Sequence, residues 1–212
     1  MIRWLEVAEL AGAEPVVGSR SLLPSLQVTS ADVEAAAAAW PHPGPIVLLH
    51  VSARDRRRCW SPAKFASVGC HLRATFAPTL LLVGGEPDHE ASAQVAELIG
   101  EGAVDLTGQV SLGGTLALAR RSRLFLGNDS GPRHLAAAVG TPTVGIFWVG
   151  NLMAFGPLVG GANRALVSFT VACPMCGREQ VDDPCEHDVS FVDSVTTEQV
   201  LRACEEALSC HS

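Results

Sequence analysis

Residues 124–148, LFLGNDSGPRHLAAAVGTPTVGIFW, contain the pattern that decides the fold. Two apolar runs rich in β-forming residues, Leu124–Leu126 and Thr143–Phe147, flank an alanine-rich segment. Glycines at positions 131 and 140 bound that segment on its two sides. This order predicts a strand, a tight turn, a short helix, a second turn and a second strand.

The turn between the first strand and the helix is the candidate site. Pro132 suits the first helical position, where its missing N–H is no loss, and we expect Ser130 or Asp129 to cap the first turn. At the carboxyl end of a parallel strand, the amides of Ser130–Arg133 and the positive end of the helix dipole face the crevice where ligands bind. The turn predicts a seat for a phosphate or diphosphate. The alternative is a capped surface helix whose alanines pack on the sheet.

The composition is that of a compact globular protein with an acidic balance. Of the 212 residues, 48% are hydrophobic and 17% are charged, which provides for one core and excludes a disordered chain. The formal net charge is −7, but four of the fifteen cationic residues lie together at Arg54, Arg56, Arg57 and Arg58. One basic cluster on an acidic chain predicts a discrete anionic ligand and argues against nucleic acid as a partner.

The N-terminal residues do not read as a secretory signal, because Arg3, Glu6 and Glu9 interrupt the apolar positions. No apolar run approaches the roughly 18 residues that cross a bilayer. We therefore expect a cytoplasmic protein with no transmembrane segment. Its seven cysteines are then expected to be reduced or metal-bound rather than paired.

Strands and helices alternate from residue 45 onward. The expected strands are 46–51, 79–83, 104–106, 124–126, 143–147 and 164–169, and the expected helices are 61–76, 89–99, 112–121 and the segment after 131. Such alternation predicts right-handed crossovers and a doubly wound, Rossmann-like α/β domain with a parallel sheet. We expect residues 151–163 to be irregular and Thr196 or Thr197 to cap a C-terminal helix. We expect residues 45–212 to form the domain and residues 1–44 to form a helical lead-in with helices at 4–10 and 30–39.

Two further segments carry residues suited to a nucleotide. Arg58 offers a guanidinium that can clamp a phosphate bidentately, and the alternative is a solvated basic loop. Glu86 follows two glycines at the end of a predicted strand and can accept both hydroxyls of a ribose, or be solvated in an ordinary turn. No G-x-G-x-x-G follows a predicted strand, which weakens the interpretation as a dinucleotide-dependent dehydrogenase.

The cysteine-rich segment 173–187 has the spacing of a metal site. Cys173 and Cys176 form a C-x2-C pair, and Cys185 and His187 follow as C-x-H. Three thiolates and one imidazole complete a tetrahedral site, for which zinc is the default ion and iron the alternative. Closed sites of this kind are structural, so we expect the ion to staple a loop. The other interpretation is a cluster of reduced cysteines.

The residues of the central turn and helix carry a resemblance to a known family. The run N-D-S-G-P-x-H-L-A-A-A-x-G-x-P-T-V at 128–144 resembles the signature of the heptosyltransferase-like glycosyltransferases of family 9. These enzymes transfer heptose from ADP-heptose in lipopolysaccharide core synthesis. The resemblance covers residues 45–205 and is strongest at 106–148. It implies the C-terminal, nucleotide-sugar-binding half of a GT-B enzyme with an ADP-heptose-like donor.

The family's motifs imply roles for individual residues. Its Lys-x-Trp-Pro-like element, whose lysine contacts the donor phosphates, is matched by Arg58 and Trp60, with arginine in place of lysine. An acidic residue near Glu86 contacts the nucleoside, and a D-L-T-G-x-x-S-L element lies near the base. Some autotransporter heptosyltransferases of the family carry a cysteine-bound iron in the region of 173–187. The expected substrate-binding residues are Arg58, Trp60, Glu86, Thr107, Gly108, Asp129, Ser130, Gly131, Pro132, Arg133 and His134.

We expect Asp129 and His134 to bind the donor rather than transfer protons, and we expect no catalytic metal. The family's general base and acceptor site lie in an N-terminal domain that we do not expect within these 212 residues, so no catalytic residue is assigned. One alternative is a nucleotide-sugar-binding module that works with an acceptor-binding partner subunit or as a homo-oligomer. Another is an inactive copy, against which the joint retention of Trp60, Gly131 and Pro132 with Asp129 and His134 argues.

Overall fold

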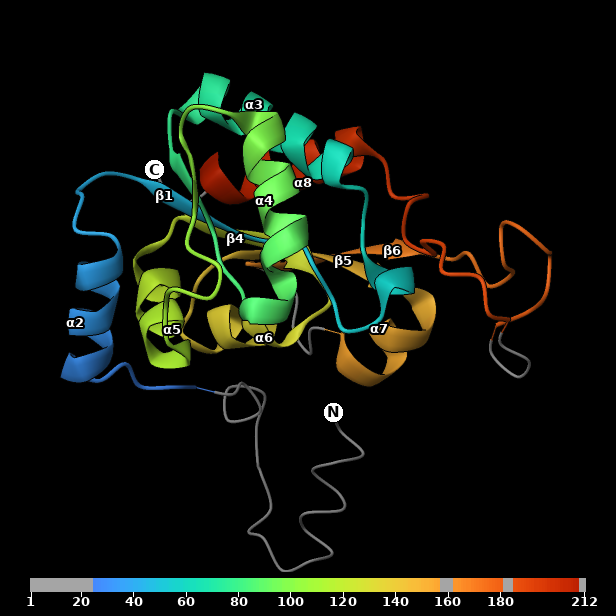
Figure 1. Cartoon of the computed structure of the whole chain (residues 1–212), viewed down its shortest axis with the longest axis horizontal. Helices are drawn as coiled ribbons and strands as arrows, with labels where there is room; N and C mark the ends of the chain where they lie inside the picture. Colours follow the sequence, from blue (N-terminus) through green and yellow to red (C-terminus); the bar gives the residue numbers. More distant parts are fainter. Residues whose placement is uncertain (1–24, 157–161, 181–184, 210–212) are drawn as a thin grey trace, which may run out of the picture.

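The computed structural model of the chain describes residues 25–156, 162–180 and 185–209, and these form a parallel sheet between two layers of helices (Figure 1). The sequence-predicted helix at 4–10 lies outside these residues. The six strands are β1 (Ile46–His50), β2 (Thr79–Leu82), β3 (Ala103–Asp105), β4 (Leu124–Asn128), β5 (Thr143–Trp148) and β6 (Asn163–Ser168).

Helices connect or flank these strands. The α-helices are α2 (Ser30–Ala39), α3 (Pro62–Phe76), α4 (His89–Ile99), α5 (Leu112–Arg121), α6 (Gly131–Ala138), α7 (Val149–Phe155) and α8 (Thr197–Ser209), with single 3-10 turns η1 (Arg56–Arg58) and η2 (Glu86–Asp88). None of the helices in the described ranges is long and apolar enough to cross a bilayer.

The strand order is β3-β2-β1-β4-β5-β6, and every pair of neighbours is parallel. This is the order of doubly wound nucleotide-binding sheets, so the predicted fold class is confirmed. The chain reverses its direction of travel across the sheet between β1 and β4. The carboxyl ends of these two strands form the switch point, where open α/β sheets bind their ligands.

Each face of the sheet has its own apolar core. Along β1, Val47 and Leu49 belong to the core under α3, α4 and α8, whereas Ile46 and Leu48 belong to the core under α2, α5 and α6. All five β1 residues are buried, as expected for a strand covered on both faces. Figure 1 shows the two helical layers above and below the sheet.

Three expectations about elements need adjustment. Residues 149–155 form α7, where we expected an irregular segment from residue 151. The side chain of Asn151 donates to Asp129 Oδ2 at 3.0 Å, a contact across 22 positions that local sequence signals do not reveal. The strands β3 and β6 each begin and end one residue earlier than predicted. Helix α2, predicted within the lead-in, contributes Ala36 to a core, so it packs as part of the domain.

Candidate functional site

A cleft of about 1150 Å³ opens at the switch point, over the carboxyl ends of β1 and β4. Its walls come from the segment after β1, from the start of α4 and from the turn that begins α6. Those walls are rich in charged and polar side chains, which include Arg54, Arg56, Arg58, Asp88, Glu90, Asp129, Ser130, His134, Asp188 and Asp193. The cleft therefore suits a polar, charged ligand.

Asn128 joins the two strand ends that floor the cleft. Its side chain is fully buried, donates to the carbonyl of Val51 at 2.9 Å and accepts from the backbone N–H of Trp60 at 3.0 Å. A buried amide that is satisfied on both sides fixes the distance between its neighbours. The turn after β4 and the segment after β1 are therefore held in one arrangement.

The predicted cap of α6 is corrected by the structure. Ser130 is the residue before the helix, but its side chain makes no capping hydrogen bond. The Ser130 hydroxyl instead lies 3.0 Å from Nδ1 of His50 at the end of β1. A Cβ placed on Gly131 would meet no atom within 4 Å, so there is open space directly in front of the first turn. The first turn of α6 thus faces the cleft, as the sequence predicted.

Beneath Ser130, His50 and Asp88 continue a chain of polar contacts. Nε2 of His50 lies 3.4 Å from Oδ2 of Asp88, and the hydroxyl of Ser52 donates to Oδ1 of the same carboxylate. The N–H of Gly85 donates to Oδ2 at 2.8 Å. His50 above all, together with Ser52 and Gly85, lowers the pKa of Asp88 to about 2 against the effect of burial. Asp88 is therefore a carboxylate near neutral pH.

Three of the four arginines of the cluster each pair with a different carboxylate. Arg57 donates to Asp55 at 2.8 Å, and that hydrogen-bonded pair lowers the pKa of Asp55. Arg56 pairs with Asp188 at 3.2 Å on the surface. Arg58 reaches across the cleft, with Nη1 3.9 Å from Oδ2 of Asp129.

Asp129 and His134 lie together at the start of α6. Nε2 of His134 is 3.3 Å from Oδ1 of Asp129, and the Asp129 side chain is only 4% exposed. Arg58 and His134 thus both face Asp129, which arranges two basic side chains around a buried carboxylate. Pro132 lines the cleft beside them.

The side chain of Arg133 leaves the cleft. It is 1% exposed, and its guanidinium lies over the ring of Phe147 at 4.7 Å from the centroid. A Cβ on Gly145 would come within 2.6 Å of Arg133 Cδ, so the absence of a side chain on β5 makes room for it. Burial lowers the pKa of Arg133. Arg133 can offer its backbone to a ligand, while its side chain packs in the domain.

Trp60 is a structural anchor of the cleft. Its ring is fully buried, meets Phe65 edge to face at a centroid distance of 5.0 Å, and donates from Nε1 to the carbonyl of Val195 at 2.9 Å. A side chain held this way positions the segment that carries Arg58.

Glu86, Thr107 and Gly108 form a second group at the ends of β2 and β3, outside the walls of the cleft described above. Gly108 has φ +74 and donates its N–H to the carbonyl of Gly84 at 3.0 Å. A Cβ on Gly108 would come within 2.7 Å of Glu86 Oε2. The three residues predicted near the nucleoside are therefore neighbours in space, although Glu86 precedes Thr107 and Gly108 by about 20 positions in the sequence.

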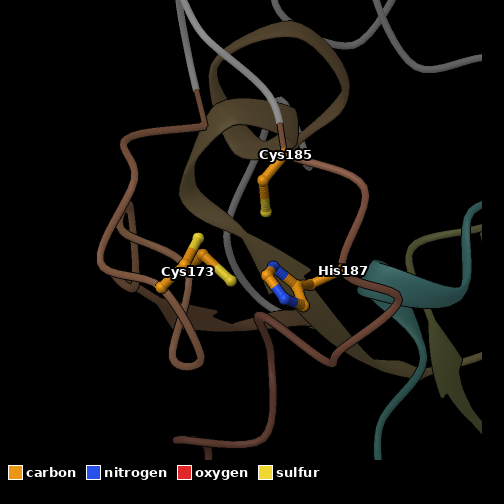
Figure 2. A group of neighbouring side chains, drawn as sticks. Cys173, Cys185 and His187 are labelled. Atoms are coloured by element: carbon orange, nitrogen blue, oxygen red, sulfur yellow. The ribbon is translucent and has the colours of Figure 1, made fainter.

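The predicted metal ligands come together in space. One ligand atom from each of Cys173, Cys176, Cys185 and His187 lies within 4.8 Å of the others, and Figure 2 shows side chains from both halves of the loop turned toward one centre. In a tetrahedral zinc site with Zn–S bonds of about 2.3 Å, neighbouring ligand atoms are about 3.8 Å apart. Three sulfurs and one imidazole at these distances fit a single ion after a small contraction. The cysteine-rich group can therefore hold a metal.

A knuckle of backbone hydrogen bonds supports these ligands. The N–H of Gly177 donates to the carbonyl of Cys173, and the N–H of Cys173 donates to the carbonyl of Arg178, both at 2.8 Å. Gly177 has φ +72, a left-handed conformation that glycine adopts without strain. Burial opposes ionisation of Cys173, but N–H groups of Cys176 and Met175 lower the pKa of its thiol. A lowered thiol pKa favours the thiolate that a metal requires.

The metal loop is tied to the arginine segment. The N–H of Phe191 donates to the carbonyl of Arg57 at 2.7 Å, and the hydroxyl of Ser190 donates to the carbonyl of Cys59 at 2.8 Å. The side chain of Gln180 contacts both segments. Its Nε2 lies 3.2 Å from the sulfur of Cys185, and its Oε1 lies 3.5 Å from Nη1 of Arg57. The residues immediately before and after Arg58 in the sequence are therefore both held by hydrogen bonds.

A doubly wound sheet with a polar cleft and a helix N-terminus at its switch point is the arrangement in which open α/β sheets bind their ligands. The family model of glycosyltransferase family 9 (heptosyltransferase) matches residues 5–181, which is most of the chain. The chain therefore belongs to glycosyltransferase family 9. The match starts within the predicted lead-in, 40 residues before the region on which the sequence resemblance rested.

Individual relatives agree with this assignment. Lipopolysaccharide heptosyltransferase 3 of Escherichia coli is 34% identical over 124 residues, which are 51% of this chain and 36% of that protein. A family 9 glycosyltransferase structure from Veillonella parvula has a TM-score of 0.79 at 21% identity and covers 99% of this chain and 59% of its own. The iron-containing dodecameric heptosyltransferase TibC of enterotoxigenic E. coli has a TM-score of 0.57 at 18% identity, covering 81% and 47%.

The chain thus spans about a third of the curated relative and about half of these solved structures. At such low identity, the likeness to the structures concerns the fold.

Sequence reasoning missed several residues of the cleft. His50 and Ser52 stand at the carboxyl end of a buried strand, and polar residues in that position are a usable signal. Asp88 lies 36 positions beyond Ser52, and only the packing of α4 brings it under the turn. Asn128 and Asn151 are also far from their partners in sequence, so nothing local indicates them.

Proposed function

We propose that the cleft binds the nucleoside diphosphate of an ADP-heptose-like nucleotide sugar and that this chain is the donor-binding part of a heptosyltransferase. The observation that carries the proposal is the open first turn of α6 at the switch point, with Gly131 facing empty space and Arg58 opposite. Backbone N–H groups at a helix N-terminus bind phosphate oxygens, and a guanidinium adds charge and two donors. The solved structure of TibC was determined with ADP-D-β-D-heptose, which supports this class of donor.

The same arrangement suits the chemistry of glycosyl transfer. When the bond between the sugar and the diphosphate breaks, negative charge develops on the leaving diphosphate. Fixed donors aimed at that charge lower the barrier, since they need no reorganisation during the reaction. The backbone N–H groups of Ser130 and Gly131, the Arg58 guanidinium and the His134 ring line the cleft and can supply this stabilisation. No step in this scheme requires a metal in the cleft.

Glu86, Thr107 and Gly108 are proposed to hold the nucleoside. The Glu86 carboxylate is exposed and can accept from the ribose hydroxyls, as carboxylates after the second strand do in related sheets. The buried hydroxyl of Thr107 has no hydrogen-bond partner among the described residues. A ligand group that reached this hydroxyl would satisfy it.

The metal at Cys173, Cys176, Cys185 and His187 is proposed to be a structural zinc or iron. Zinc favours tetrahedral sulfur and nitrogen ligands, and iron is supported by the description of TibC as iron-containing. All four tetrahedral positions are provided by protein side chains, so the ion would close the loop and leave no position for substrate.

An acceptor-binding partner is also proposed. The described residues form a donor cleft, and we assign none of them to the acceptor hydroxyl. A second copy of the chain is the alternative partner, for which the dodecameric state of TibC is a precedent within the family.

Calorimetry with ADP, GDP and UDP tests the proposed function. We expect ADP to bind with a dissociation constant between micromolar and millimolar, or about −8 to −4 kcal/mol. Gly131→Val should abolish the heat, because its side chain would fill the space that the phosphate needs. The same variant should keep its melting temperature, since that space is empty in the protein alone. Absence of binding by all three nucleotides would contradict the proposal.

A further inference from the structure

Three side chains, of which His50 is buried and the other two are partly buried, form a line under the proposed diphosphate seat. The Ser130 hydroxyl is 3.0 Å from His50 Nδ1, and His50 Nε2 is 3.4 Å from Asp88 Oδ2. Ser130 immediately precedes α6, His50 ends β1, and Asp88 ends η2. His50 is only 4% exposed, so its ring exchanges hydrogen bonds with these neighbours rather than with bulk water.

The carboxylate determines which nitrogen of His50 carries a proton. Asp88 already accepts from Ser52 and from the N–H of Gly85. With a pKa of about 2, it is ionised near neutral pH and can only accept. The hydrogen bond to His50 therefore requires a proton on Nε2. The protonation of Nδ1 then decides how Ser130 is used.

Each state of Nδ1 gives Ser130 a different role. In the neutral ring, Nδ1 accepts the proton of the Ser130 hydroxyl, which leaves only oxygen lone pairs facing the cleft. In the doubly protonated ring, Nδ1 donates to the Ser130 oxygen, and the hydroxyl proton can point to a ligand. An anionic ligand repels the first arrangement and is bound by the second.

We propose that His50 takes up a proton when a diphosphate binds in the cleft, and that the resulting imidazolium turns the Ser130 hydroxyl into a donor to the diphosphate. This inference rests on the proposed function for the nature of the ligand. His50 does not touch the ligand and acts through Ser130, so it is a positioning residue. Asp88 holds the ring in place and balances its charge from behind.

The charges around His50 favour this coupling. From the α4 side, Asp88 contacts the ring and Glu90 lines the cleft. From the α6 side, Asp129 Oδ1 lies 3.3 Å from Nε2 of His134, and Asp129 Oδ2 lies 3.9 Å from Nη1 of Arg58. The loop after β1 adds Arg54 and Arg56, both exposed, to the cleft wall. Asp88 is thus the carboxylate in contact with His50, and a bound diphosphate adds negative charge on the other side of Ser130.

The coupling would assist catalysis as well as binding. During transfer, the leaving diphosphate becomes more negative, so a donor backed by an imidazolium strengthens as the reaction proceeds. Charge-assisted hydrogen bonds are about twice as strong as neutral ones. The line from Asp88 to Ser130 therefore places a positive charge behind the leaving group without exposing it to solvent.

Calorimetry of ADP binding in buffers of different ionisation enthalpy measures the protons taken up. We expect the full chain to take up a fraction of a proton at pH 7 and to bind more tightly as the pH falls from 8 to 6. ADP itself titrates in this range, so the difference between variants is the decisive quantity. In His50→Gln the uptake should fall to the part contributed by ADP, with affinity lower by about 10- to 100-fold.

Further variants separate this role from a structural one. Asp88→Asn keeps an acceptor near the ring but removes the charge, so the uptake should fall even where His50→Gln does not fold. Ser130→Thr should retain the uptake, and Ser130→Ala should reduce it together with affinity. His71→Gln is the matched control, because His71 is exposed and paired with Glu205 on α8. It should bind and titrate as the unaltered chain does.

His134 provides the competing explanation. Uptake that persists in His50→Gln but disappears in His134→Gln would overturn the proposal, as would ADP binding with no uptake beyond that of the nucleotide. If ADP does not bind, the proposed function fails separately. Inorganic diphosphate then replaces ADP in the same titrations, and uptake that depends on His50 would still support the proton coupling.

Discussion

Arg58 stands opposite the turn after β4, held there by Trp60 two positions later. The indole is buried and bonded to the carbonyl of Val195, and the Trp60 N–H is bonded to Asn128. The Arg58 side chain is 24% exposed, so its guanidinium is partly shielded from water and close to Asp129. A diphosphate that entered the cleft would replace Asp129 as the main negative partner of the Arg58 guanidinium, or would contact the guanidinium together with Asp129.

Arg58→Gln should weaken ADP binding by about 10- to 100-fold, the range expected when a charge-assisted hydrogen bond is lost. Arg58→Lys should bind ADP with an affinity between those of the unaltered chain and Arg58→Gln, because lysine keeps the charge but cannot bind two oxygens in one plane. Arg120→Gln is the control. Arg120 is exposed near the end of α5, which leads into the opposite end of β4 from the cleft. Equal losses in Arg58→Gln and Arg120→Gln would show a nonspecific charge effect.

Single residues were predictable where their chemistry is local. Asp129, Ser130, Gly131 and Pro132 follow one strand and precede one helix, so spacing alone placed them at the cleft. The partner of Ser130 was not predictable, because His50 precedes it by 80 positions. Local reasoning assigned Ser130 to a helix cap, and the tertiary contact with His50 replaces that cap.

At the scale of elements, the cysteine loop and the arginine segment are joined. The N–H of Phe191 and the hydroxyl of Ser190 donate to the carbonyls on either side of Arg58, and the metal ligand His187 lies a few residues before these donors. The sequence spacing predicted the ligand set. It could not predict this junction, because the residues that are hydrogen-bonded across it are more than 120 positions apart in the sequence.

We expect one zinc or iron ion per chain in protein purified without added metal, as measured by elemental analysis. Cys176→Ser should lose most of the ion, since oxygen replaces one of three sulfur ligands. Cys70→Ser is the matched control, because Cys70 is exposed on α3 and is not part of the ligand group. A metal content below about a tenth of an equivalent, with all thiols reactive, would identify a reduced cysteine cluster.

Removal of the metal with a chelator should loosen the segment that carries Arg58. ADP binding should then weaken by about 2- to 10-fold, because part of the binding free energy is used to order Arg58. Calorimetry before and after chelation measures this effect, and readdition of metal should reverse it. In Cys176→Ser, which lacks most of the ion, chelation should change nothing. An unchanged ADP affinity on complete metal removal would show that the loop and the arginine segment are independent.

Most strands and helices could be predicted from sequence patterns, and α7 could not. Every strand and helix from β1 to β5 was predicted within a few residues, because apolar periodicity and caps are local properties. Helix α7 was not, since its seven residues include Gly150 and Asn151 and carry weak helical preference. Its contact with Asp129 through Asn151 indicates that tertiary packing stabilises it.

For the whole molecule, we expect slow or undetectable glycosyl transfer by the 212-residue chain alone. Alignment of an acceptor hydroxyl with the anomeric carbon accounts for roughly 7 to 11 kcal/mol of such a barrier, and a general base adds about 10²- to 10⁴-fold. We assign neither role to the described residues. Adding an acceptor-binding partner should raise turnover with little change in ADP affinity. Ordinary enzyme rates from the pure chain would contradict this, and alanine variants of Asp129 and His134 would then be assayed first.

A crystal structure of the full chain with ADP tests the assignment of the cleft as the donor site most directly. We predict diphosphate oxygens within hydrogen-bond distance of the backbone N–H groups of Ser130, Gly131 and Arg133 and of the Arg58 guanidinium. We also predict the ribose beside Glu86 and the base near Thr107 and Gly108. ADP bound elsewhere on the protein, with the first turn of α6 still open, would contradict the assignment of this cleft as the donor site.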